Sequence, residues 1–294
     1  QLGLAHLLEH MAFNGSKNFP KQKIDEYMSS IGLNLGSHYN AYTSYIETSY
    51  DFEIPTKNKE DVEVAIKILA DISKNLSLEP EAFERERKIV EEEWRRDIGG
   101  TNKYVEEFHK HLFKNSRLLE RKPIGTLDVI QNFKYQDAID YYQKWYQPEL
   151  MGFLVIGDIE TNHMVQTIKD NFGSFKNSQE LKIPDYKIPN YPENQFFVFQ
   201  DDEIESISFS FFEKNDFKKN NSFENYREAL IGYLTEAIFE RRVREIKEKN
   251  EQNFLSAYIT DFNVSDLDAF KIAAVTLKED KILLGIEDFL TLIE

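Results

Sequence analysis

Residues 3–13 read Gly-Leu-Ala-His-Leu-Leu-Glu-His-Met-Ala-Phe, and their apolar side chains recur at the spacing of an α-helix. At about 100° per residue, one face of that helix collects the apolar residues Leu4, Leu7, Leu8 and Met11. The opposite face collects His6, Glu9 and His10. The sequence therefore predicts an amphipathic helix that packs by one side and directs two imidazoles and one carboxylate into the same space.

Two histidines four residues apart lie one helical turn apart, a spacing that lets two imidazoles share one metal ion. The plain alternative is a pair of surface histidines beside a salt-bridging glutamate. The flanking Leu-Gly before and Met-Ala-Phe-Asn-Gly after the motif argue against that alternative. A zinc site needs a third protein ligand and an open position for water. Because the chain has no cysteine, the third ligand is expected among its carboxylates and its four other histidines.

A second helical segment, at about 80–97, is rich in glutamate. The side of this helix that carries its apolar residues also carries Glu86 and Glu93, two turns apart. Carboxylates on a buried face are costly unless they meet a cation. Glu93 is therefore the predicted third ligand, with Glu86 as its support. Glu92 is expected to point outward, and Glu91 to lie on the flank.

The composition indicates a folded chain with a sizeable core: 294 residues, 41% of them apolar, with 23 Phe and 15 Tyr. The formal net charge of −16 predicts a surface that repels phosphate backbones and anionic lipid, so no nucleic-acid partner is expected. No apolar run approaches the length of a membrane span. The absence of cysteine excludes disulfides, thiol catalysis and thiolate metal sites.

The order of predicted elements indicates two related α+β units. In the first, helical patterns occupy 20–31, 59–75, 80–97, 103–113, 134–146 and 161–172, with extended segments at 38–54 and 151–156. In the second, we expect a strand at 196–212, a helix at 223–249, strands at 253–262 and 268–277, and a helix at 279–293. We therefore expect a first domain over 1–180, a proline-containing linker over 181–195 and a second domain over 196–294.

The helical motif and the sequence Glu86-Arg-Lys-Ile-Val-Glu-Glu-Glu93 together resemble the M16 family of metallopeptidases, also called pitrilysins or inverzincins. The family pattern has two zinc histidines, a general-base glutamate between them, a distant zinc glutamate and a further glutamate seven residues before the last. Glu93 lies 83 positions after His10, a longer gap than is usual in the family. Glu92 and Glu91 therefore stay alternatives for the third ligand.

Other stretches also resemble the family, and the segment around the first motif is most similar to its bacterial PqqL-like branch. These stretches are Ile31–Ser44 with Glu47–Tyr50, Pro123–Gly125, and Trp145–Pro148 leading to Ile156–Asp158. The resemblance is strong over about 1–160 and weaker over 190–294. The branch favours a bacterial periplasm over the cytoplasm as the location.

The resemblance implies a zinc-dependent endopeptidase or oligopeptidase that hydrolyses extended peptides or small unfolded proteins. It implies one Zn²⁺ per catalytic domain, held by His6, His10 and Glu93. A zinc-bound water would attack the scissile carbonyl with Glu9 as general base, and Glu86 would support the catalytic machinery.

The stretch Tyr39–Tyr50 resembles the strand that pairs with bound substrate in this family. An extended peptide added to a sheet edge is read through its main chain, so many sequences are accepted. Asn40, Ala41 and Tyr42 are the candidate substrate contacts, with Phe13 as a pocket wall. The plain alternative for these aromatics is ordinary core.

The family resemblance also implies two M16-type domains, each a mostly antiparallel sheet with helices packed on one face. The chain then corresponds to an N-terminal-half fragment, with the first strand missing and the second domain truncated. A second M16 half, from the same full-length chain or from a partner subunit, would close a chamber around peptide substrates. Two alternatives stay open: a precursor-processing peptidase, and a metal-free structural or partner subunit of an M16 assembly.

Overall fold

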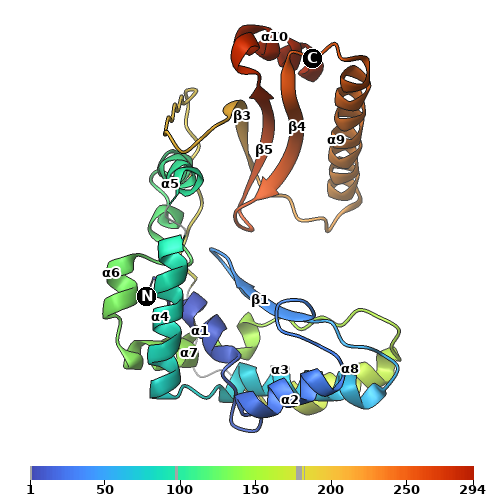
Figure 1. The fold of residues 1–294 in the computed structure, drawn as a ribbon. Helices are drawn as coiled ribbons and strands as arrows, with labels where there is room; N and C mark the ends of the chain where they lie inside the picture. The colour runs from blue at the N-terminus through green and yellow to red at the C-terminus, as the bar shows by residue number, and fades with distance from the viewer. Residues whose placement is uncertain (1, 97–98, 177–180, 182) are drawn as a thin grey trace. The chain divides into compact units, whose positions relative to one another are not determined.

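The computed structural model describes residues 2–96, 99–176, 181 and 183–294 (Figure 1). The chain divides into two compact units. The first unit comprises residues 1–98 and 120–185, and the second unit comprises residues 99–119 and 186–294. The division into domains 1–180 and 196–294 stays a prediction. The compact units differ from it mainly in residues 99–119, which belong to the second unit.

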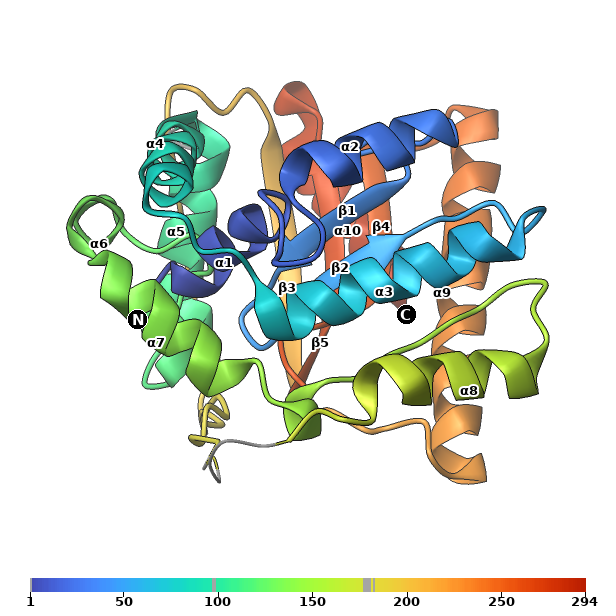
Figure 2. The same ribbon diagram turned by 90° about the horizontal axis from the view of Figure 1, so that it is seen from below.

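The first unit is mostly helical, with one short β-hairpin (Figure 2). Its elements are α1 (Leu4–Ala12), α2 (Lys21–Ser30), β1 (Tyr39–Thr43), β2 (Thr48–Phe52), α3 (Lys59–Asn75), α4 (Pro80–Arg96), α6 (Leu127–Asn132), α7 (Tyr135–Trp145), η2 (Pro148–Leu150) and α8 (Thr161–Phe172). Strands β1 and β2 pair antiparallel, with Ala41 opposite Tyr50. All of these helices match expected segments within a few residues, except the short α6 and η2.

Helix α1 lies in the core of the first unit. Its apolar face is at most 1% exposed and consists of Leu4, Leu7, Leu8, Met11 and Ala12. This face packs against α4, α7 and β1. Burial of each large side chain contributes about 1.5–3 kcal/mol. The packing therefore fixes the rotation of α1 about its axis and, with it, the direction of its polar side chains.

The loop after α1 is held by a buried carboxylate of α3. Asp71 accepts hydrogen bonds from the Ser16 hydroxyl, the backbone N–H and side-chain amide of Asn18, and the side-chain amide of Asn75. Burial raises the pKa of Asp71, but these hydrogen bonds outweigh it and leave the pKa below its ordinary value. The loop also turns at Gly15, whose φ of 104° favours glycine.

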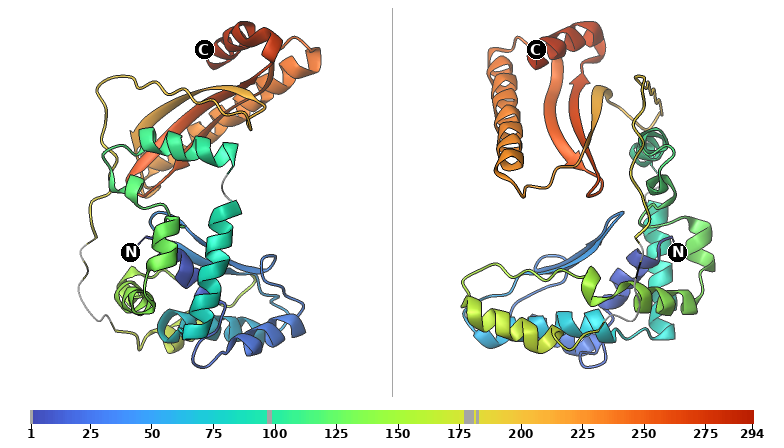
Figure 3. Two further views of the ribbon diagram at one scale, coloured as in Figure 1. Left: turned by 60° about the vertical axis from the view of Figure 1, so that its left-hand side comes forward. Right: turned by 180° about the vertical axis from the view of Figure 1, so that it is seen from behind.

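The second unit is built on a three-stranded antiparallel sheet of order β3-β5-β4 (Figure 3). Its elements are α5 (Gly100–Leu112), β3 (Ile207–Asp216), α9 (Phe223–Lys249), β4 (Phe254–Asn263), β5 (Asp268–Leu277), η3 (Glu279–Lys281) and α10 (Ile282–Ile293). The last residue of η1 (Arg117–Glu120) is assigned to the first unit and the others to the second. Helices α9 and α10 pack against the sheet around buried Phe239, Phe254 and Phe289.

Helix α5 covers the opposite face of this sheet from α10. Neighbouring strand residues point to opposite faces, and Phe211 contacts Phe289 of α10 whereas Phe212 contacts Phe108 of α5. The aromatic residues Phe197 and Phe199 complete the packing around α5. This packing explains why residues 99–119 belong to the second unit.

Two expected strands are wrong in whole or in part. Residues 151–156 form no strand, and Leu154 and Ile156 are more than 80% exposed. The expected strand over 196–212 begins only at Ile207. An apolar run shows that a segment suits a strand, but a strand also needs a neighbouring backbone to pair with. In the expected linker over 181–195, Ile188 is buried and donates its N–H to Asp268. Residue 182 of this linker lies outside the described residues, as do 177–180 before it.

Candidate active site

Two helices of the first unit supply the polar side chains predicted from the sequence. Helices α1 and α4 pack against each other (Figure 2). Helix α1 carries His6, Glu9 and His10, and α4 carries Glu86 and Glu93. Both helices are anchored by apolar faces in the same core. The sequence-distant carboxylates and imidazoles therefore meet because the two apolar faces pack together.

His6, His10 and Glu93 form a group whose ligand atoms lie within 4.8 Å of one another. The Nε2 atoms of His6 and His10 lie 3.7 and 3.6 Å from Oε2 of Glu93. These separations exceed a hydrogen bond. Two ligand atoms about 2.1 Å from a tetrahedral zinc lie roughly 3.4 Å apart, close to the separations found.

The donor set therefore fits zinc. Oε2 of Glu93 is buried and accepts no hydrogen bond from any residue that the structure describes. A buried carboxylate oxygen that faces two imidazoles without a hydrogen bond is the arrangement that a shared cation would satisfy. Two nitrogens and one oxygen would also leave a fourth position for water.

The second ring nitrogen of His10 is also held by a carboxylate. His10 Nδ1 lies 3.4 Å from Oε2 of Glu86, so its imidazole stands between Glu86 and Glu93. Burial lowers the pKa of His10, but the two carboxylates outweigh burial and raise the pKa to about 9. The pKa of Glu86 is lowered, because its bonds to His10 and Asn14 outweigh burial, and that of Glu93 is lowered chiefly by His10.

Asn14 and Arg85 hold Glu86 in place and were not predicted from the sequence. The side-chain amide of Asn14 donates to Oε1 of Glu86 at 2.8 Å and to the carbonyl of His10 at 3.1 Å. The guanidinium of Arg85 in turn donates to the side-chain oxygen Oδ1 of Asn14 at 2.7 Å. The sequence pointed to Asn14 only through its position, one helical turn after His10.

Glu9 is nearly buried, with 9% of its surface exposed. Its Oε2 accepts a hydrogen bond of 2.5 Å from the Thr43 hydroxyl at the end of β1. Burial raises the pKa of Glu9 and prevails over Thr43 and His10, which lower it. Thr43 is a second neighbour that the sequence analysis missed.

The alternative third ligands are engaged elsewhere. Glu91 and Glu92 both pair with Arg95, and Glu91 also accepts a hydrogen bond from Gln131. Glu92 is 64% exposed, in keeping with the outward direction expected for it. The structure brings Glu93, and neither of these two, next to the histidines.

The candidate substrate contacts lie along β1. Asn40 and Tyr42 are exposed, Ala41 is half-buried, and the Tyr42 hydroxyl donates to Glu47. Strand β1 pairs with β2 on one side only, and no other strand of the described chain pairs with its second edge. Phe13 packs against the rings of Tyr39 and Tyr50. At the start of β1 the carbonyl of Tyr39 accepts a hydrogen bond from the N–H of Gly36, so among the described residues the part of this edge that lacks a partner strand is 40–43.

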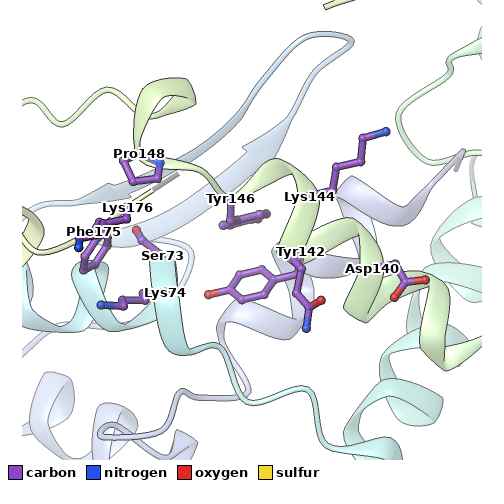
Figure 4. Close-up of a pocket in the computed structure, with 10 residues that line it drawn as sticks. Ser73, Lys74, Asp140, Tyr142, Lys144, Tyr146, Pro148, Phe175 and Lys176 are labelled. Atoms are coloured by element: carbon purple, nitrogen blue, oxygen red, sulfur yellow. The ribbon is translucent and has the colours of Figure 1, made fainter. Parts of the chain in front are cut away.

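A cavity of about 500 Å³ in the first unit is lined by none of the candidate site residues (Figure 4). Tyr142 of α7 and Tyr146, which directly follows α7, form part of its wall, together with Ser73, Lys74 and Phe175. The Tyr146 hydroxyl lies 2.7 Å from that of Tyr50. Burial raises the pKa of both hydroxyls well above its ordinary value. This tyrosine pair fastens β2 to α7.

Two sequence profiles of one peptidase family match this chain. The profile described as insulinase (peptidase family M16) matches residues 1–120, and the profile described as the peptidase M16 inactive domain matches residues 132–292. The second match alone covers more than half of the chain. The chain therefore belongs to peptidase family M16, and the expected α+β fold is confirmed.

Relatives with the PqqL name match most of the chain. The probable zinc protease PqqL of Haemophilus influenzae is 30% identical over 261 residues, which cover 87% of this chain and 28% of that relative. The crystal structure of the periplasmic protease PqqL from Escherichia coli superposes at 26% identity with a TM-score of 0.86, over 99% of this chain and 32% of that one. The solved first half of the same protease gives the same TM-score, over 63% of that chain.

The expected resemblance to the PqqL-like branch is thus confirmed. The relatives from Haemophilus influenzae and Escherichia coli are both named as probable zinc proteases. This chain spans less than a third of the length of the Haemophilus influenzae relative. Among the helices that the structure describes, none combines the length and apolar character needed to cross a membrane.

Proposed function

We propose that this chain carries the catalytic site of a zinc-dependent endopeptidase that hydrolyses extended peptides or small unfolded proteins. The observation that carries the proposal is the group formed by His6, His10 and Glu93, with Glu9 beside it on the same helix. The names of the PqqL relatives as zinc proteases support the same reaction class.

His6, His10 and Glu93 would hold one Zn²⁺. When bound, zinc acts as a Lewis acid that lowers the pKa of water towards about 7. Glu86 keeps the His10 ring in place through Nδ1, which leaves Nε2 directed at Glu93. A carboxylate on the far nitrogen of a ligand imidazole fixes its orientation and tautomer and raises its basicity.

Glu9 acts as the general base in this proposal. Its carboxylate takes a proton from the attacking water and passes it to the leaving amine nitrogen as the peptide bond breaks. A carboxyl whose pKa is raised by burial binds this proton more readily than an exposed one does. Since Oε2 accepts from Thr43, Oε1 is the oxygen available for the water.

The free edge of β1 binds the substrate backbone. Main-chain groups of Asn40, Ala41 and Tyr42 pair with an extended peptide, and Phe13 forms one wall beside it. Such pairing accepts many side chains, which suits a peptidase of broad specificity and requires an unfolded substrate.

The remaining parts of the proposal concern the protein beyond this chain. A second M16 half would close a chamber over the site, and the solved first half of PqqL supports such a division. The description of PqqL from Escherichia coli as periplasmic supports a periplasmic location for this protein.

The first experiment measures zinc per chain by elemental analysis for the unmodified protein, Glu93→Gln and the matched control Glu92→Gln. About one zinc that is lost only in Glu93→Gln is the expected result. Full zinc in Glu93→Gln would assign the third ligand elsewhere. No zinc in any of the three after reconstitution would contradict the proposal and favour a metal-free subunit.

The second experiment measures cleavage of an unstructured peptide by the natural, full-length protein and by Glu9→Gln. We expect Glu9→Gln to keep its zinc and to lose at least about 100-fold in kcat, the range of general acid–base catalysis. Cleavage by Glu9→Gln at the unmodified rate would refute the role of Glu9. A panel of peptides compared with a single presequence would separate broad degradation from precursor processing.

A further inference from the structure

The hydrogen bond between Thr43 and Glu9 joins the proposed base to the proposed substrate strand. Thr43 is the last residue of β1, and its hydroxyl donates to Oε2 of Glu9, 34 residues earlier in the chain. The Thr43 hydroxyl also lies 3.3 Å from the hydroxyl of Thr48, its register partner on β2. One side chain thus connects α1 to the end of the hairpin.

We infer that Thr43 is a positioning residue, which fixes the carboxylate of Glu9 and couples it to the strand where the peptide binds. This inference rests on the proposed function, because it assigns a role to Thr43 only if Glu9 is the base and β1 binds the substrate.

The chemistry of the two groups supports a positioning role. An ionised carboxylate only accepts hydrogen bonds, so the hydroxyl that reaches Glu9 has to be the donor. The bond occupies one lone pair of Oε2 and orients the carboxylate plane, and Oε1 is left to accept from the water of the proposed reaction. Glu9 is nearly buried, and a buried carboxylate without a donor is costly, so the bond also stabilises the carboxylate in this position.

The backbone around Thr43 makes this orientation precise. A β-branched side chain has restricted χ1 rotamers, and its strand is paired in register with β2. Substrate pairing along the free edge of β1 would order the same strand whose last residue holds Glu9. Peptide binding at Asn40, Ala41 and Tyr42 is therefore linked to the alignment of Glu9 through the next residue of β1, Thr43.

The experiment compares three variants of the natural, full-length protein. Thr43→Val removes the hydroxyl and keeps the shape, Thr43→Ser keeps the hydroxyl, and Thr48→Val removes the neighbouring hydroxyl that does not contact Glu9. We measure kcat and KM on an unstructured peptide, zinc per chain and the thermal midpoint.

For Thr43→Val we expect kcat to fall about 10- to 100-fold with KM and zinc content unchanged, because small misplacement of a catalytic group has effects of this size. Thr43→Ser should recover most of kcat, and Thr48→Val should stay within about twofold. A kcat for Thr43→Val within twofold of the unmodified protein, or an equal loss in Thr48→Val, would overturn the inference.

A double variant separates this inference from the proposed function. In the Glu9→Gln background, Thr43→Val should cause no further loss of kcat, since the two residues act as one unit. Its peptide affinity, measured by fluorescence anisotropy, should also be unchanged. An inactive Glu9→Gln with an unaffected Thr43→Val would refute the positioning role alone. An active Glu9→Gln would refute the proposed base and the positioning role together.

Discussion

Helices α1 and α9 differ in how much of their surface is buried. Helix α1 has nine residues, six of them buried, whereas α9 has 27 residues and only Phe239 and Val243 are buried. Among the residues described by the structure, the only group able to hold a metal draws two of its three members from α1. The difference shows that precise placement of polar side chains comes from the burial of their helix, not from its length.

The outer face of α9 is apolar over its first four turns. Its exposed side chains include Phe223, Tyr226, Leu230, Tyr233, Leu234 and Ile238. The face of α1 opposite its apolar side carries instead the two histidines and the nearly buried Glu9. The comparison predicts that substitutions in α1 will change zinc binding, peptide cleavage or stability. Substitutions on the exposed face of α9 should change none of these.

The largest effect is expected from a ligand of α1. His6→Ala should abolish measurable peptide cleavage and zinc retention in the full-length protein, because two ligands remain where zinc needs three from the protein. The matched control is His163→Ala, which removes a half-exposed imidazole 3.1 Å from Glu63. Equal zinc in both variants, measured by elemental analysis, would contradict this prediction.

A smaller effect is expected from the apolar faces. Leu8→Ala in α1 should lower the free energy of unfolding by about 3–4 kcal/mol, because Leu8 is fully buried and leaves a cavity. Leu234→Ala in α9, where the side chain is 62% exposed, should stay within about 0.5 kcal/mol. Chemical denaturation gives both values. A similar cost for both substitutions would show that the face of α9 is covered in solution.

The loop that follows α1 should contribute stability that depends on pH. Asp71→Asn should lower the free energy of unfolding by about 2–3 kcal/mol at neutral pH, since it removes a charged acceptor of buried hydrogen bonds. The folded pKa of Asp71 lies below its ordinary value of 3.8, so its contribution is present above that pH and is lost as the pH falls further. Unfolding curves at pH 7 and pH 3 should therefore differ less for the variant than for the unmodified protein.

The smallest effect concerns the pH dependence of metal affinity. A proton on His10 competes with zinc, and its pKa of about 9 leaves His10 protonated at neutral pH in the metal-free chain. Zinc affinity should therefore rise about tenfold per pH unit between about pH 7 and 8.5. Calorimetric titrations in buffers of different ionisation enthalpy should detect the release of about one proton. An affinity that does not change over this range would contradict the raised pKa.

The sequence predicted the elements of the site better than the contacts between them. Helical periodicity placed His6, Glu9 and His10 on one face of α1, and the apolar pattern of α4 selected Glu93 over Glu92. These assignments depend on one helix at a time. Thr43 and Asn14 were missed because their roles arise only when separate elements pack together.

The errors in the fold have the same origin. Residues 151–156 are apolar and suit a strand, but pairing depends on a second backbone that the pattern does not specify. Local sequence patterns do not specify which unit residues 99–119 belong to. Their assignment depends on tertiary contacts, such as the packing of Phe108 on Phe212. The helix and strand boundaries over 223–293, which depend on local patterns, were predicted to within three residues.

The position of His10 between Glu86 and Glu93 has a consequence for how the site takes up a metal. In the metal-free chain, a proton on His10 supplies positive charge between two carboxylates that would otherwise repel each other. The same charge helps to keep the pKa of Glu86 and of Glu93 below its ordinary value in the metal-free chain. On the proposed function, zinc would take the place of this proton on His10, so metal loading would release a proton from a site whose charges are already balanced.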